Sequence, residues 1–133
     1  MSPLRLLVVD DETALLQLLA KYLTRLGYAV DACASAGDAW DRFHRAPGNY
    51  ALVAADLTLP DMPGEELLRR MLELNPRVCV LVCSGYPYDP SDLPVAAPAQ
   101  AGFLQKPFSP KMLAEALERL LAKPETTGSG PEA

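Results

Sequence analysis

The sequence predicts a doubly wound α/β fold, in which helices cover both faces of a parallel sheet. Apolar runs that suit strands alternate five times with stretches of helical periodicity, and this alternation is typical of parallel strands joined by right-handed crossovers. Residues 6–9 contain no polar side chain, which predicts a strand that is buried on both faces. A length of 133 residues is that of one domain.

The first third of the chain predicts a strand between two helices. Residues 13–26 have helical periodicity and precede Gly27, a residue suited to the left-handed position after a helix. The apolar stripe of this helix is Leu15, Leu19, Tyr22, Leu23 and Leu26. Residues 28–33 have less apolar bulk and one charge, which indicates a strand at the sheet edge. Ser35 then predicts the N-cap of a helix that runs to about Arg45.

Two aromatic side chains of this second helix could have a chemical role. Trp40 could stack on a flavin or a base, but it precedes Phe43 by three residues on one apolar stripe, so we expect a core contact. His44 is the only histidine and has no ligand partner at metal spacing. We therefore expect it on the surface.

The rest of the chain repeats the pattern of strand and helix. Three more apolar runs predict strands at residues 50–56, 78–83 and 102–105. One helix is expected over residues 65–74, and another begins at Pro110 with Ser109 as its N-cap. Their inward side chains are Leu67, Leu68, Met71 and Leu72, and Leu113, Leu117, Leu120 and Leu121. We expect one domain over residues 1–122 and a disordered tail over residues 123–133, which have almost nothing to bury.

The strand order follows from apolar content. The first, third and fourth strands are the most apolar and should be central, which predicts the order 2-1-3-4-5 of a flavodoxin-like three-layer sandwich. Ligands of such sheets bind at the carboxyl ends of the strands, near the point between the first and third strands. The polar residues expected at these ends are Asp10, Asp11, Asp56, Ser84 and Lys106.

Each of these residues also has a plain structural interpretation, as a helix cap, a turn former or a surface charge. Their coincidence at one end of one sheet favours a site. Three carboxylates and one ammonium sum to −2, which a divalent cation such as Mg²⁺ would neutralise. Metal and ammonium could then stabilise a phosphoryl group transferred to an aspartate, for which Asp56 is the best placed, with Ser84 as a hydroxyl donor.

Composition excludes several other classes of function. A net charge of −5 and a pI near 4.8 argue against nucleic acid or an anionic membrane as a partner. No run approaches the ~20 apolar residues of a membrane span, and no secretory signal precedes the first strand, so we place the chain in the cytoplasm. Three cysteines without zinc-type spacing, among them Cys79 and Cys83 on one strand, predict buried, reduced thiols.

With these motifs in order, the chain resembles a CheY-like response regulator receiver domain of two-component signalling, over residues of about 4 to 122. Four segments carry the resemblance: residues 8–12, which include both acidic residues, Asp56 with residues 59–64, Ser84 with Gly85, and residues 103–108 around Lys106. The residues after Ser84 and around Lys106 are similar to those of receivers of hybrid histidine kinases. The chain is then either a single-domain receiver or a piece of something longer.

The resemblance implies a role for each motif residue. Asp56 would accept a phosphoryl group from a phosphohistidine of a sensor histidine kinase or a histidine phosphotransfer protein. Asp11, Asp56 and the Thr58 carbonyl would coordinate Mg²⁺, with Asp10 acting through a water. Lys106 would pair with the phosphoryl group. The remaining implied roles are the switch residues Ser84 and Phe103, the residues Thr58 and Tyr86 that tune hydrolysis, and a cis peptide bond before Pro107.

One segment departs from the family pattern. Prolines at positions 87, 90, 94 and 98 fall where receivers usually have their fourth helix, and proline inside a helix costs ~3 kcal/mol. We expect one short turn around Ser91 to Ala96, or no helix. This weakens the case for output through the usual surface, so the downstream partner stays unidentified, and the sequence leaves a homodimer open.

Two other classes of function remain. A haloacid-dehalogenase-like phosphatase also uses an aspartate nucleophile, but it needs a second acid two residues on, where this chain has Thr58. A receiver-like module could dock partners without phosphorylation. A dinucleotide-binding fold is disfavoured, because no Gly-x-Gly-x-x-Gly follows the first strand. We expect a signalling domain rather than an enzyme, capable only of its own phosphorylation and dephosphorylation.

Overall fold

The sheet has the predicted topology. A computed structural model describes residues 3–122, and five parallel strands form one sheet in the order β2-β1-β3-β4-β5. The strands are β1 (Arg5–Val9), β2 (Ala29–Cys33), β3 (Leu52–Asp56), β4 (Cys79–Ser84) and β5 (Ala101–Gln105). The flavodoxin-like α/β fold is therefore confirmed. The predicted tail over residues 123–133 lies outside the described residues.

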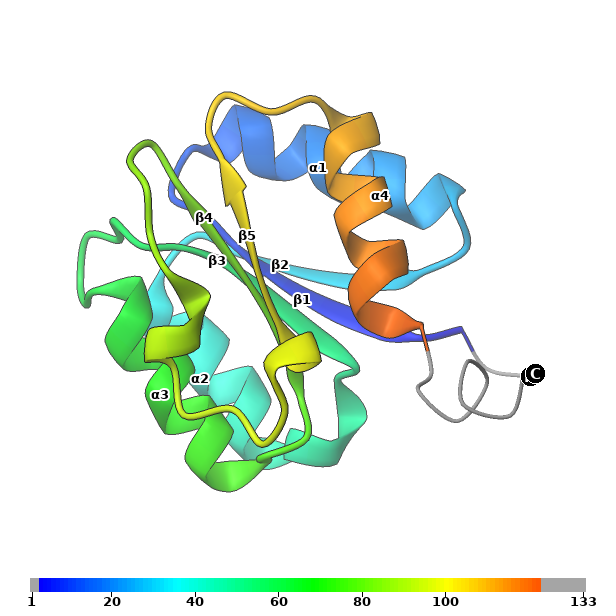
Figure 1. The fold of residues 1–133 in the computed structure, drawn as a ribbon. Helices are drawn as coiled ribbons and strands as arrows, with labels where there is room; N and C mark the ends of the chain where they lie inside the picture. The colour runs from blue at the N-terminus through cyan, green and yellow to red at the C-terminus, as the bar shows by residue number, and fades with distance from the viewer. Residues whose placement is uncertain (1–2, 123–133) are drawn as a thin grey trace.

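Four α-helices cover the two faces of this sheet (Figure 1). The helices are α1 (Thr13–Arg25), α2 (Ala36–Arg45), α3 (Gly64–Leu74) and α4 (Pro110–Leu121). Helices α1 and α4 pack on one face, where Leu6 and Val8 belong to their core, whereas α2 and α3 pack on the other with Leu7 and Val9. Alternate side chains of a strand point to opposite faces, so β1 is buried on both, as its composition predicts. None of the helices within residues 3–122 is long and apolar enough to cross a membrane.

The stripe predicted for the first helix is partly wrong. Leu16 is buried with Leu19 and Leu23, whereas Leu15 is only half-buried and Leu26 is 51% exposed. The helix ends one residue before Leu26, because Gly27 takes a left-handed conformation with φ of 103° and turns the chain away. In the last helix, Leu120 and Leu121 are likewise only half-buried, since they lie in its final turn.

The aromatic pair of α2 behaves as expected. Phe43 is fully buried, and Trp40 packs half-buried against the same core. His44 is exposed and stacks on Trp40, with ring centroids 5.6 Å apart. These contacts account for both side chains without a ligand.

The segment between β4 and β5 has no α-helix, as its prolines predict. It contains two 3-10 turns, η2 (Pro90–Asp92) and η3 (Pro98–Gln100), each beginning with proline. The turn expected around residues 91–96 is therefore displaced, because proline suits the first position of a turn and not its interior. We call residues 86–100 the strap.

Side-chain contacts hold the strap on the face that α2 and α3 cover. Leu93 is 3% exposed and belongs to the core of this face. The Tyr88 hydroxyl donates to Glu65 at 2.6 Å, and Arg69 donates to the Asp92 carbonyl at 2.9 Å. Both partners lie on α3, so this helix fixes the strap.

The start of α3 lies tightly against the end of β3. Gly64 donates its N–H to the Leu57 carbonyl at 2.8 Å, and an isolated bridge joins Thr58 to Pro63. A Cβ at position 64 would overlap the Asp56 carbonyl oxygen and approach the Leu57 Cα to 2.8 Å. Glycine is therefore required where the loop after β3 closes beneath Asp56.

Substitution of this glycine should destabilise the fold. The Gly64→Ala variant should lose about 2 to 3 kcal/mol of unfolding free energy, the upper range for overpacking, because the new methyl group meets backbone. Gly48→Ala is the matched control, since a Cβ there meets nothing within 4 Å, and it should stay within about 0.5 kcal/mol of the parent. Urea denaturation of both variants measures the difference, and equal midpoints would contradict the packing described.

Candidate functional site

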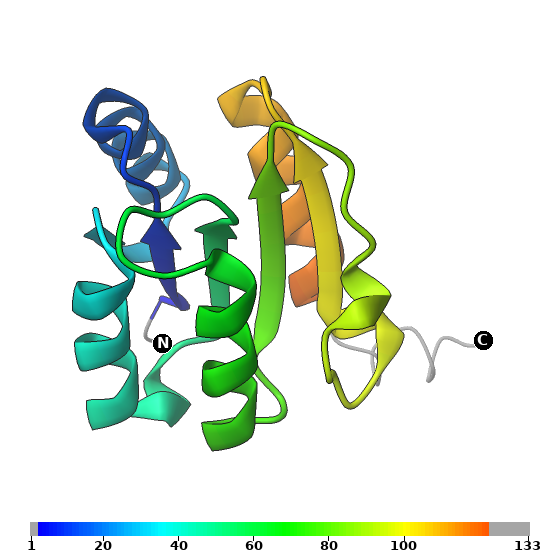
Figure 2. The same cartoon turned by 90° about the vertical axis from the view of Figure 1, so that its left-hand side faces the viewer.

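The polar residues expected at the strand ends lie together at one edge of the sheet. All five strands are parallel, and Figure 2 shows the arrows of β1, β3, β4 and β5 pointing the same way. Asp10 follows β1, and Asp56 and Ser84 end β3 and β4. Lys106 follows β5, and its N–H donates to the Ser84 carbonyl at 2.7 Å. The topology thus brings residues from four strands to one place.

The Lys106 ammonium is the centre of this group. Its Nζ lies 2.9 Å from Asp10 Oδ2, 2.9 Å from Glu12 Oε1 and 3.1 Å from Asp56 Oδ2. Partial burial by itself lowers the pKa of Lys106, but the hydrogen bonds with the three carboxylates outweigh it and raise the pKa above its ordinary value. The lysine is therefore charged at any physiological pH.

Asp10 is the most buried of the acidic groups. Its side chain is 5% exposed, and burial raises the pKa of its carboxyl group. The Glu12 N–H, 2.9 Å from Asp10 Oδ1, and the Lys106 ammonium work in the opposite direction. Asp10 thus depends on these two donors for its charge.

The acidic group has the composition of a divalent cation site. Asp10, Asp11 and Asp56 offer carboxylate oxygens within 4.8 Å of one another. With Glu12 and Lys106 the cluster sums to −3, because it contains four carboxylates and one ammonium. Mg²⁺ prefers hard oxygen ligands and keeps several waters, so a partly exposed carboxylate cluster of this kind fits it.

Asp56 has a donor on each of its oxygens. Oδ2 faces Lys106, and Oδ1 accepts the Thr58 N–H at 3.2 Å. Two donors hold the carboxylate in one orientation, and its side chain is 9% exposed at the edge of the cluster.

The other implied site residues belong to the same ends of β3, β4 and β5. Ser84 is 1% exposed, and its Oγ accepts the Tyr86 N–H at 3.1 Å. The hydroxyls of Thr58 and Tyr86 lie 3.1 Å apart and join the ends of β3 and β4. Phe103 is half-buried against the α2 and α3 core, and the peptide bond between Lys106 and Pro107 is cis.

Sequence reasoning missed the contact of Glu12. The residue was part of the acidic motif but received no role, although it bonds Lys106 from 94 positions away. Its place directly after Asp10 and Asp11, before α1, was the signal that could have indicated it.

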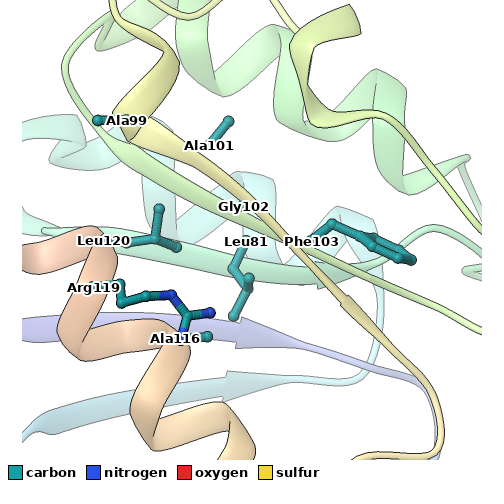
Figure 3. A pocket seen from close by; sticks show the side chains of 8 residues that line it. All are labelled: Leu81, Ala99, Ala101, Gly102, Phe103, Ala116, Arg119 and Leu120. Atoms are coloured by element: carbon teal, nitrogen blue, oxygen red, sulfur yellow. The ribbon is translucent and has the colours of Figure 1, made fainter.

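Two further features do not belong to the acidic cluster: a thiol next to it in the sheet, and a hollow towards the start of β5. Cys83 pairs with Asp56 across the sheet, and burial raises the pKa of its thiol to about 12, so it stays neutral. The three cysteines are free thiols, and Cys33 and Cys83 are buried as expected, whereas Cys79 is only half-buried. A hollow of about 300 Å³ lies against β5 and α4, between Gly102, Leu81 and Leu120, and is mainly apolar (Figure 3).

The family of the chain follows from comparison with known proteins. The model of the response regulator receiver domain matches residues 6–118. The chain belongs to this family. Receiver domains are signalling domains of two-component systems and bind Mg²⁺ in an acidic pocket.

Individual relatives agree with this assignment. The receiver is 34% identical over 117 residues to the sensor kinase CckA of Brucella abortus (strain 2308). This match covers 88% of this chain and 12% of CckA. It is 29% identical to the response regulator receiver protein CpdR of the same organism, over 88% of this chain and 96% of CpdR. A solved CheY-like receiver domain protein of Methanospirillum hungatei JF-1 has a TM-score of 0.80 at 29% identity and covers 90% of this chain and 94% of its own.

Removal of the receiver's central ammonium should expose the repulsion between its carboxylates. We expect Lys106→Met to lose about 3 kcal/mol of unfolding free energy at pH 7, as for a buried ion pair that loses one partner. Without the lysine, the pKa of Asp10, which burial already raises, should rise further in the folded state. An acid whose folded pKa is raised lowers stability only at pH values above its unfolded pKa. The stability deficit of Lys106→Met should therefore shrink towards pH 4.

Lys111→Met is the matched control, since Lys111 is an exposed residue of the first turn of α4. It should change stability by less than about 0.5 kcal/mol at either pH. Chemical denaturation at pH 4 and pH 7 makes the comparison. A Lys106→Met deficit that is independent of pH would contradict the electrostatic explanation.

Proposed function

We propose that this receiver accepts a phosphoryl group on Asp56 and changes conformation in response. The observation that carries the proposal is the position of the Asp56 carboxylate, 3.1 Å from the Lys106 ammonium and within the same cluster as Asp10 and Asp11. A carboxylate nucleophile in phosphoryl transfer needs positive charge near the phosphoryl oxygens. Both sources of that charge, a lysine and a cation site, adjoin Asp56.

In the proposed reaction, an Asp56 oxygen forms a bond to phosphorus while the bond from phosphorus to a donor imidazole nitrogen breaks. The imidazole leaves with the electron pair of that bond and takes up a proton. Asp11, Asp56 and the Thr58 carbonyl would hold Mg²⁺, and Asp10 would act through a water. When bound, the ion would supply positive charge to the phosphoryl oxygens in addition to that of Lys106.

Lys106 would serve the reaction by exchanging partners. It now bonds Asp10, Glu12 and Asp56, and a phosphoryl group on Asp56 would offer it oxygens of higher charge. Ser84 would release the Tyr86 N–H and donate its hydroxyl to the same group. Phe103, half-buried beside the strap, would follow this change.

The donor we propose is a sensor histidine kinase or a histidine phosphotransfer protein, and the downstream partner is a protein. Support comes from the relatives, one a sensor kinase and one a response regulator receiver protein. No activity on a separate substrate is proposed beyond the receiver's own phosphorylation and dephosphorylation. A cytoplasmic location stays a prediction.

Incubation with acetyl phosphate and Mg²⁺, followed by intact mass measurement, tests the proposal. The parent receiver should gain one labile phosphoryl group, and chelation of Mg²⁺ should abolish the gain. Asp56→Asn should gain none, because the amide lacks the nucleophilic oxygen. Asp41→Asn, which changes an exposed acid of α2, is the matched control and should match the parent.

The other classes of function predict different results. A docking module that works without phosphorylation would show no gain of mass in the parent. An aspartate-nucleophile phosphatase would release phosphate steadily from a phosphomonoester. Either result would overturn the proposed function.

Thr58 and Tyr86 should set the lifetime of the phosphoryl group. Their hydroxyls are bonded at 3.1 Å, and Tyr86 is 55% exposed, so this bond holds the ring at Thr58, two residues after Asp56. Tyr86→Phe should change the lifetime about fivefold, corresponding to one net hydrogen bond of about 1 kcal/mol. Tyr28→Phe, at the other end of the sheet, is the control. The decay of phosphorylated mass after removal of donor measures the lifetimes, and equal values would refute this role.

A further inference from the structure

The acidic residue Asp61 joins the loop after β3 to the start of α2. It lies in the loop between β3 and α3, which reaches across to the N-terminus of α2 (Figure 2). Asp61 Oδ1 accepts the Ala36 N–H at 3.0 Å, and Oδ2 accepts the Gly37 N–H at 2.9 Å. Each carboxylate oxygen therefore has its own backbone donor on another element.

These contacts complete the cap of α2. The first N–H groups of a helix have no partner within the helix. Ala36 and Gly37 are the first two residues of α2, and both bond Asp61, whereas Asp38 bonds the Ser35 hydroxyl at 3.2 Å. Sequence reasoning found Ser35 but not Asp61, because the second cap comes from 25 positions away.

The local structure shows that this contact is close and charged. Gly37 permits the approach, since a Cβ there would lie only 3.3 Å from Asp61 Oδ2. The hydrogen bonds from Gly37 and Ala36 lower the pKa of Asp61, so the carboxylate is ionised. A negative charge at a helix N-terminus also interacts favourably with the helix dipole.

The loop that Asp61 holds is the one that carries the candidate metal ligand Thr58. Its base is fixed by Gly64, which bonds Leu57, and by the bridge between Thr58 and Pro63. The middle of the loop is held on α2 by Asp61. Among residues 57–63, Asp61 is the residue whose side chain is described as hydrogen-bonded to α2. Thr58 itself bonds Asp56 and the Tyr86 hydroxyl, and Asp61 adds the attachment of its loop to α2.

We propose that Asp61 is a positioning residue for the phosphoacceptor site, which acts by clamping the Thr58 loop to α2. This inference rests on the proposed function, because it gives Thr58 a purpose in holding Mg²⁺. The clamp keeps the Thr58 N–H on Asp56 Oδ1 and the Thr58 carbonyl ready for the ion. Groups that orient metal ligands from outside the coordination sphere typically contribute 10- to 100-fold to metal affinity.

Three variants separate positioning from simple capping. Asp61→Ala removes both contacts, Asp61→Asn keeps one acceptor oxygen in the same shape, and Asp38→Ala removes a charge from the first turn of α2 without touching the loop. Mg²⁺ alone is the probe, titrated by calorimetry well below the melting temperature of each variant. Amide hydrogen exchange of Ala36, Gly37 and Thr58 is measured without metal.

The clamp predicts a defined pattern. Asp61→Ala should raise exchange at all three amides and weaken Mg²⁺ binding about tenfold, the low end of such effects. Asp61→Asn should fall between Asp61→Ala and the parent, and Asp38→Ala should match the parent. Should Asp61→Ala fail to fold, Asp61→Asn alone decides. If either Asp61 variant frees Ala36 and Gly37 while Thr58 exchange and Mg²⁺ affinity stay within twofold of the parent, Asp61 is only a cap and the inference is wrong.

Phosphorylation by acetyl phosphate distinguishes this inference from the proposed function. A parent that takes no phosphoryl group, but whose Mg²⁺ affinity falls on loss of Asp61, would refute the phosphoacceptor function and leave the clamp standing. A parent that is phosphorylated, with Asp61→Ala phosphorylated as fast at every Mg²⁺ concentration, would refute the clamp and leave the phosphoacceptor function standing.

Discussion

Two buried carboxylates, Asp10 and Asp56, share the single ammonium of Lys106 at 2.9 and 3.1 Å. The oxygens of the two carboxylates lie within 4.8 Å of each other. At the effective dielectric of a protein, like charges at this distance repel by a few kcal/mol, and burial removes the water that would otherwise screen them. Lys106 offsets this repulsion but leaves the cluster with excess negative charge, because Asp11 and Glu12 adjoin it. The cluster is therefore only partly neutralised, which suits the Mg²⁺ that receiver domains bind in an acidic pocket.

The fold makes this charge arrangement possible. In a parallel sheet, every strand ends at the same edge, so residues at the ends of β1, β3 and β5 meet there. The strands themselves supply rigidity, because β1 and β3 are buried on both faces. Asp10 and Asp56 therefore lie at the ends of two strands that are packed on both faces, and the loops complete their surroundings.

The sequence predicted what depends on periodicity and on strand ends, and missed what depends on distant contacts. Apolar runs identified all five strands and their order, and the residues after them identified Asp56 and Lys106. The contacts of Glu12 with Lys106 and of Asp61 with Ala36 span 94 and 25 positions, and no local pattern encodes them. The prediction that Leu26 faces the core was wrong for a different reason. Helical spacing continues through Leu26, but the left-handed Gly27 ends the helix before it.

The strap shows how a sheet face can be covered without a helix. A helix satisfies its own backbone, whereas the strap has only a few backbone bonds within its two turns and adds side-chain bonds. Arg69 of α3 donates to the Asp92 carbonyl, and the Gln100 side chain of the strap accepts the Ala97 N–H. Each such bond contributes on the order of 1 kcal/mol, and Leu93 supplies the one fully buried side chain between residues 86 and 100. Phe103 borders an open hollow with Pro87 and Pro90. If the Phe103 ring moves, the strap can adjust by breaking a few individual contacts, whereas an α-helix would lose cooperative backbone hydrogen bonds.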